Sequence, residues 1–249
     1  MAVLHWSQHK LLVFRLEANG TSTLLHTIGG SGAGPKQFKD PNKMCLAPNG
    51  NMLVCEYGNN RVQELTGPGE TEPAHVRDIT GITQPCSCAV YGDMLAVGTY
   101  VGTVVLLSYS TGTIIRTIGS KGAGRGNIGN YAVGIRFSLD GGAILVAEHD
   151  NKRLSKFRMP NGEFEDFVCA DQISNGHKDV EIAPKGEIIV ADIGANRVCV
   201  FSMDGRTLLR TWGTCGTANG QFRSPTALAL VGNQLFVLDV HNARVQVFE

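Results

Sequence analysis

A motif made of an acidic residue, a short polar gap, an arginine and an alternating apolar run recurs along this chain. It reads "EYGNNRVQEL" from Glu56, "EHDNKRLSKF" from Glu148, "DIGANRVCVF" from Asp192 and "DVHNARVQVF" from Asp239. Neighbouring arginine positions are 42 to 51 residues apart, a period typical of propellers, solenoids and arrays. With that position as the reference, the chain contains six units, at Lys10, Arg61, Thr103, Arg153, Arg197 and Arg244.

Each unit contains three readable strands and a looser fourth strand. The first follows a Gly-rich loop, as in "PTALAL" from Pro225. The second is a nearly continuous apolar run such as "MLVC" or "LFVL", which predicts a strand covered on both faces. The third alternates, as in "RVQVF", and is expected to be half buried. The 31 glycines, well above the usual ~7%, fit the many tight turns that such a chain needs.

Four-stranded units with a doubly covered second strand predict an all-β fold, a β-propeller of four-stranded antiparallel blades. Six blades are favoured, and the alternative is five blades with the "TLLHTIG" strand from Thr23 completing the last blade. The first unit lacks a first strand and the last lacks a fourth, so we expect incomplete terminal blades or a piece of a longer protein. The predicted repeats are 1–29, 30–73, 74–117, 118–169, 170–212 and 213–249.

The segment "GTANGQFRSPTALALVGNQLFVLDVHNARVQVF" resembles the NHL repeat family. Its Gly-rich loop, Gln-Phe pair, Pro, strand, Asp and Asn-x-Arg-Val follow in the family's order. "GSGAGPKQFKDPNKMCLAPNGNMLVCEYGNNRVQEL" is nearly as similar, whereas one unit departs, with Gly98 at the acidic position and Thr103 in place of the arginine. The resemblance covers essentially the whole chain and implies a single NHL-type propeller domain over residues 1–249.

The recurring acid ends the second strand of a unit, and the arginine begins the third. The two side chains are expected to meet across the hairpin as a structural latch, while the asparagines accommodate the turn. The alternative is a ring of metal-binding or catalytic carboxylates. The predicted latch pairs are Glu56 with Arg61, Glu148 with Arg153, Asp192 with Arg197, and Asp239 with Arg244.

The loop leading into the first strand and the loop between the second and third strands should emerge on one face, here called the top face. Basic and aromatic residues alternate there, a pattern that can bind single-stranded RNA by phosphate neutralisation and base stacking. Several proteins with NHL propellers bind RNA on such a surface. The alternative is that these residues only solubilise and pack the loops. The predicted binding residues are Lys36, Lys39, Tyr57, Tyr100, Lys121, Arg125, His149 and His241, with Trp6 and Tyr131 on the same face.

The net charge and the absence of a clear metal-binding motif reduce the number of functions that the sequence supports. Lys plus Arg and Asp plus Glu both total 22, so no global field directs the protein to nucleic acid or membrane. Some NHL-like propellers, such as the amidating lyase, hold zinc through histidines, but His5, His149 and His241 occupy non-equivalent positions here. We therefore predict no cofactor, no metal and no small-molecule substrate. The expected function is a non-enzymatic scaffold that binds a protein partner through the top face. An RNA-binding propeller is the first alternative, and a metal-dependent lyase or hydrolase the second.

The sequence also gives an expectation of location. No apolar run approaches the ~18–20 residues needed to cross a bilayer, and the first residues lack a signal-peptide pattern. The seven cysteines are scattered, several within apolar strand patterns where a thiol behaves as a small hydrophobe. These features predict an intracellular, cytoplasmic and reduced protein.

Overall fold

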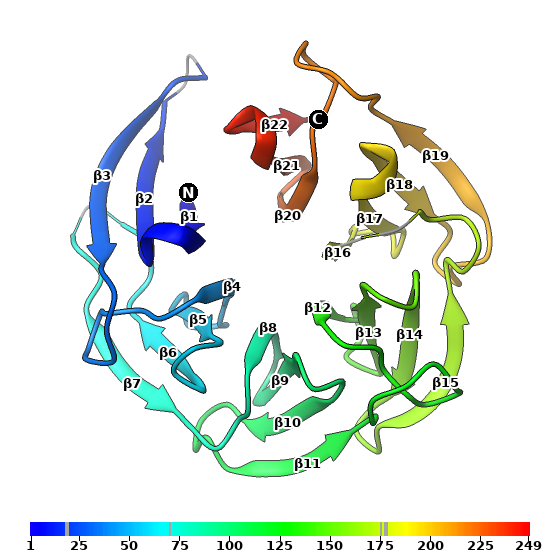
Figure 1. The fold of residues 1–249 in the computed structure, drawn as a ribbon, viewed down its shortest axis with the longest axis horizontal. Coiled ribbons are helices and arrows are strands. Elements are labelled where there is room, and N and C mark those ends of the chain that lie inside the picture. The colour runs from blue at the N-terminus through cyan, green and yellow to red at the C-terminus, as the bar shows by residue number, and fades with distance from the viewer. Residues whose placement is uncertain (18–19, 70, 175, 177–178) are drawn as a thin grey trace. The chain divides into compact units, whose positions relative to one another are not determined.

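The computed structural model describes residues 1–17, 20–69, 71–174, 176 and 179–249. Consecutive strands in these ranges form six antiparallel sheets, each an up-and-down meander (Figure 1). Helical structure in them amounts to three single turns of 3-10 helix: η1 (Trp6–Gln8), η2 (Ile193–Ala195) and η3 (Val240–Asn242). The predicted all-β propeller of six blades is confirmed. None of these helical turns has the length and hydropathy needed to cross a lipid bilayer.

The chain divides into two compact units, Met1–Thr117 and Ile118–Glu249, with three blades in each. The blades of the first unit are β1 (Ala2–His5), β2 (Lys10–Leu16) and β3 (Ser22–Gly29); β4 (Pro41–Leu46), β5 (Met52–Glu56), β6 (Arg61–Leu65) and β7 (His75–Ile79); and β8 (Pro85–Tyr91), β9 (Met94–Thr99), β10 (Val104–Ser108) and β11 (Ile114–Ile118), which ends one residue past the unit limit.

The second unit repeats the same meander. Its blades are β12 (Ala132–Phe137), β13 (Ala143–Glu148), β14 (Arg153–Arg158) and β15 (Glu163–Val168); β16 (Asp179–Ile182), β17 (Ile188–Asp192), β18 (Arg197–Phe201) and β19 (Leu208–Trp212); and β20 (Pro225–Val231), β21 (Gln234–Asp239) and β22 (Arg244–Phe248).

The first and last blades have three strands each, as the sequence predicts. The "TLLHTIG" segment forms β3 and pairs with β2, so the five-bladed alternative, in which it completes the last blade, is wrong. The strand β7 pairs with β6, which extends the second blade to Ile79, past the predicted repeat limit at residue 73. This strand has an alternating pattern in which Ile79 alone is buried, so it carries no apolar run that would assign it to a blade.

The apolar cores lie between neighbouring blades of each unit. Every residue of β5, β13 and β17 is buried, which confirms the predicted double covering of these second strands. Each fully buried Leu, Val or Ile side chain there contributes about 1.5–3 kcal/mol of transfer free energy. The fourth strands are less buried than the second strands, as in β11, where Ile118 alone is buried.

The hairpin between the second and third strands has the same backbone feature in all six blades. The residue just before the reference position has a positive φ, from 49° at Ala243 to 78° at Gly102. Glycine and asparagine adopt this conformation at little cost, whereas a β-carbon normally disfavours it by about 1 kcal/mol or more. The other four residues at this position are His9, Asn60, Lys152 and Asn196.

Ala243→Gly is therefore expected to raise the free energy of unfolding by about 0.5–1 kcal/mol. Ala243 is exposed, so removal of its methyl group sacrifices no packing. Urea unfolding checks the prediction. Ala229→Gly is the matched control, because Ala229 is an exposed residue within β20 and the same change should there lower stability by about 0.5–1 kcal/mol. A loss of stability in both variants would contradict the strain argument.

Candidate functional site

The first predicted latch is a buried ion pair on the hairpin of the second blade. Glu56 and Arg61 lie directly opposite each other in the β5–β6 ladder, and Arg61 Nε donates to Glu56 Oε1 at 2.7 Å. Glu56 is fully buried and Arg61 is 5% exposed. The carboxylate also accepts hydrogen bonds from the backbone N–H of Lys39 and from the side chain of Gln63. Every charge in the pair is thus compensated inside the blade.

The Arg61 guanidinium also binds the Gly-rich loop that precedes the blade. Its Nη1 donates to the carbonyl of Ala33 at 2.7 Å, and its Nη2 to those of Gly34 and Gln37 at 3.1 and 2.9 Å. Nη1 contacts Asp78 on β7 as well, at 2.8 Å. The planar guanidinium group can donate to all of these separated acceptors at once, whereas a lysine ammonium could not reach them together. The latch therefore fastens a loop, a hairpin and an outer strand to one another.

The structure brings the other three pairs together in the same way. The Nε-to-carboxylate distances are 3.2 Å for Arg153 with Glu148, 2.9 Å for Arg197 with Asp192, and 3.0 Å for Arg244 with Asp239. All three carboxylates are fully buried. The hydrogen bond with Asp192 raises the pKa of Arg197 above its usual range. Each arginine also donates to a carbonyl of the preceding loop, at Ala123, Gln172 and Thr217 respectively.

The third blade uses hydroxyl groups where the four blades with a latch use charges. The sequence places Gly98 at the acidic position, but the structure places Thr99 there, because Thr99 pairs with Pro85 as Glu56 pairs with Pro41. Thr99 Oγ1 lies 2.8 Å from Thr103 Oγ1 and 3.0 Å from the Thr103 carbonyl. The hairpin is one residue shorter, so counting five positions back from Thr103 gives the wrong residue.

Hydrogen bonds join the loops that were predicted to share the top face. In the first unit the backbone N–H of Asp40 donates to His9 Nδ1 at 3.1 Å, and that of Tyr57 donates to the Asp40 carbonyl at 3.2 Å. The backbone N–H of Tyr100 likewise donates to the carbonyl of Gln84. Loops leading into first strands therefore gather with loops between second and third strands. In the second unit the Ser224 carbonyl accepts from Val240 in the same arrangement.

The family model of the NHL repeat matches residues 222–248. This segment contains the buried Phe222, the strands β20 to β22 and the Asp239–Arg244 latch, and the same latch recurs in three further blades. Residues 222–248 therefore form an NHL repeat within a six-bladed β-propeller. No curated protein sequence matches it.

Three solved structures are similar in fold to this propeller. A protein from Lactobacillus plantarum superposes with a TM-score of 0.66 at 17% identity, over 84% of this chain and 67% of that one. A protein of unknown function from Bacteroides caccae gives a TM-score of 0.70 at 14% identity, over 96% and 81%. Hydrazine synthase from Kuenenia stuttgartiensis gives 0.58 at 17% identity, over 84% of this chain and 58% of that one. At these identities the likeness shows the fold alone.

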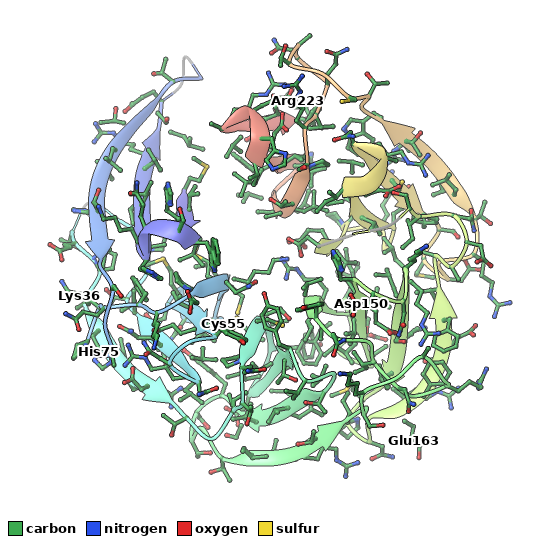
Figure 2. The ribbon with its side chains drawn as sticks, in the orientation of Figure 1. Lys36, Cys55, His75, Asp150, Glu163 and Arg223 are labelled. Atoms are coloured by element: carbon green, nitrogen blue, oxygen red, sulfur yellow. The ribbon has the colours of Figure 1, made fainter. Side chains whose placement is uncertain are left out.

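Two of the predicted binding cations of the propeller contact its own side chains. The Lys36 Nζ contacts Glu72, and Figure 2 labels Lys36 on the first unit. Arg125 stacks on the ring of Phe164, with Cζ 4.9 Å from the centroid. Lys121 is exposed, as is Lys39, whose backbone N–H binds Glu56. Sequence reasoning missed Glu72 and Phe164 as partners, because both come from other strands or loops of the blade and no motif marks them.

The two predicted histidines lie in the second unit and bind neighbouring polar groups. His149 Nδ1 is 3.1 Å from Asp150 Oδ1, and its ring packs edge-on against Tyr131 with centroids 5.8 Å apart. His241 Nδ1 is 3.1 Å from Ser224 Oγ. Within the ranges that the structure describes, no group of three or more His, Cys, Asp or Glu residues is arranged to hold a metal ion.

Three aromatic residues of the first unit, here called the aromatic row, occupy equivalent positions in consecutive blades, and two of them are in contact. Tyr57 and Tyr100 meet edge-to-face with ring centroids 4.9 Å apart and an interplanar angle of 75°. Tyr57 Oη accepts a hydrogen bond from Gln84 at 3.1 Å, and Tyr100 Oη is bonded to Asn42. Trp6 is 60% exposed on η1. With the corrected alignment of the third blade, these three aromatics occupy one position, immediately after the second strand of each blade.

Proposed function

We propose that this NHL propeller is a non-enzymatic interaction scaffold that binds a protein partner through the aromatic row of its first unit. The observation that carries the proposal is this row, in which Trp6, Tyr57 and Tyr100 follow the second strands of three consecutive blades. Tryptophan and tyrosine are enriched among the residues that dominate protein–protein binding energy, because they bury a large area at a small cost in side-chain entropy.

The charge arrangement supports a protein partner over RNA. Binding to single-stranded RNA requires cations that are available to phosphates, together with stacking aromatics. Lys36 is engaged by Glu72, and Arg125 by the Phe164 ring, so a phosphate would have to compete with contacts that already exist. Tyr57 and Tyr100 also present edges to each other rather than parallel faces, which restricts the stacking of successive bases.

The test has two arms. The first identifies protein partners and measures their affinity, and the second measures binding to RNA. Protein partners captured in cells by proximity labelling are purified, and their dissociation constants are measured against wild-type and Trp6→Ala. We expect Trp6→Ala to weaken a genuine partner by about 30-fold, equivalent to about 2 kcal/mol. Trp6 is largely exposed, so its loss should leave the fold intact. Tyr91→Ala is the matched control, because Tyr91 is an exposed aromatic at the end of β8, on the turn into β9.

The RNA arm measures binding of a random single-stranded pool at two salt concentrations. We expect no tight binding at either. Tight binding that weakens steeply with salt, and that Lys121→Glu with Arg125→Glu abolishes, would overturn the protein-partner proposal in favour of RNA. Equal affinity of wild-type and Trp6→Ala for every captured partner would overturn the role given to the aromatic row.

A further inference from the structure

Four of the seven cysteines gather between the second and third blades of the first unit. Cys45 lies on β4, Cys55 on β5, and Cys86 and Cys88 on β8. The strands β4 and β8 are the first strands of these blades and pack against each other. Figure 2 shows Cys55 within the second blade, where it belongs to the core shared with the third. The proposed interaction function does not use this cluster.

Two thiols of the cluster, those of Cys45 and Cys88, are in direct contact. Their Sγ atoms are 3.1 Å apart, although the residues are separated by 43 positions in the chain. A disulfide bond is about 2.05 Å long, so the sulfurs need to approach by only about 1 Å. Cys88 is 2% exposed, whereas Cys45 is half-buried and accessible to a small reagent. All seven cysteines are in the thiol form in the structure.

The neighbouring cysteines are less suited to reaction. Burial raises the pKa of the Cys55 thiol well above its usual range, and raises that of Cys86 to about 12. Thiolate, not thiol, attacks disulfides, so these two side chains are protected both by burial and by protonation. Both are fully buried, which leaves Cys45 as the position in the cluster where a reagent can enter.

We propose that Cys45 and Cys88 form a reversible, redox-sensitive disulfide that ties the second blade to the third. The Cys45 thiolate attacks oxidised glutathione, which forms a Cys45–glutathione mixed disulfide and releases one glutathione thiolate. Cys88 then loses its proton and attacks the Cys45 sulfur, which forms the Cys45–Cys88 bond and releases the second glutathione. Two protein thiols are oxidised and one glutathione disulfide is reduced to two thiols, so atoms and electrons balance.

The test equilibrates the purified chain in glutathione buffers of increasing oxidised fraction. Thiols are trapped by alkylation under denaturing conditions, and the peptides are identified by mass spectrometry. We expect a linked peptide pair containing Cys45 and Cys88, lighter by two hydrogen atoms. We also expect a rise in Tm of about 5–10 °C that a reductant reverses, because the bond closes a long loop of the unfolded chain. Cys215, which is exposed, reports in the same sample that the oxidant is active.

Variants in a Cys215→Ala background test the order of attack. Cys88→Ala should stop at the mixed disulfide and gain the mass of one glutathione at Cys45, whereas Cys55→Ala should still form the Cys45–Cys88 bond. Circular dichroism verifies that each variant is folded. The proposal is overturned if Cys45 and Cys88 stay alkylatable in wild-type protein while Cys215 is modified, or if the linked peptide contains Cys55 in place of Cys88. Failure of this test would leave the proposed interaction function untouched.

Discussion

Arg61→Ala is expected to lower the free energy of unfolding by about 3–5 kcal/mol. The substitution leaves the Glu56 carboxylate, which is fully buried, without its cationic partner. It also removes the donors that satisfy the carbonyls of Ala33, Gly34 and Gln37. Loss of one member of a buried pair costs far more than the pair itself contributes, because the remaining charge stays desolvated. Urea unfolding followed by circular dichroism measures the effect.

Two control variants distinguish the effect of losing the buried latch from the effect of losing any charged side chain. Arg206→Ala removes an ion pair with Asp166 at 3.0 Å, but the Arg206 side chain is 72% exposed, so we expect a change within about 0.5 kcal/mol. Arg61→Lys keeps the charge and loses the planar fork, so it should fall between wild-type and Arg61→Ala. If Arg61→Ala and Arg206→Ala destabilised the protein equally, the latch would have no special structural role.

The sequence predicts the latches because each is confined to one hairpin. The acid and the arginine are five positions apart, and an antiparallel ladder places them opposite each other whatever the rest of the fold does. The third blade shows the limit of this reasoning. Its loop is one residue shorter, so a fixed count assigns Gly98 the role that Thr99 has. Backbone pairing, which a single sequence does not contain, corrects the alignment.

The intramolecular contacts of the predicted binding residues were harder to predict, because their partners come from elsewhere in the chain. The motif places Lys36 in the loop before the second blade, but its contact, Glu72, belongs to the long loop between β6 and β7. The stack of Arg125 on Phe164 likewise joins a loop to a fourth strand. Fourth strands have the weakest sequence pattern in the repeats that contain one. Side-chain contacts that involve these segments therefore escape an argument based on periodicity.

The phenylalanine of the Gln-Phe pair was recognised as part of the repeat motif, but its packing role was not predicted from the sequence. Phe222 is fully buried and belongs to the core between the fifth and sixth blades. Its backbone N–H donates to the Thr214 carbonyl at 2.9 Å, which closes the Gly-rich loop over the ring. Gly213 lies against the ring, where an added β-carbon would be 2.4 Å from Cδ2. Phe38 and Gly29 make the same arrangement in the first unit, with a distance of 2.6 Å.

Phe222→Ala is therefore expected to cost about 3–5 kcal/mol of unfolding free energy, through lost apolar burial and the cavity that remains. Phe222→Ile should cost less, about 1–2 kcal/mol, because Ile128 occupies the equivalent loop position of the fourth blade and packs against Gly119. Urea unfolding measures both changes, which should appear as a lower unfolding midpoint with an unchanged m-value. A cost below 1 kcal/mol for Phe222→Ala would show that the loop collapses onto the vacated space.

Substitution of Gly213 in two backgrounds separates the energetic cost of ring packing from that of backbone strain at this site. Gly213→Ala should cost about 2–4 kcal/mol in the wild-type background, because the new methyl group collides with the Phe222 ring and φ is +99°. In the Phe222→Ala background the collision is removed and only the cost of the positive φ and of the nearby Asn196 carbonyl remains. The two substitutions should therefore be less destabilising together than the sum of their separate effects. Strict additivity would contradict direct packing of ring on glycine and leave backbone strain as the whole reason for glycine here.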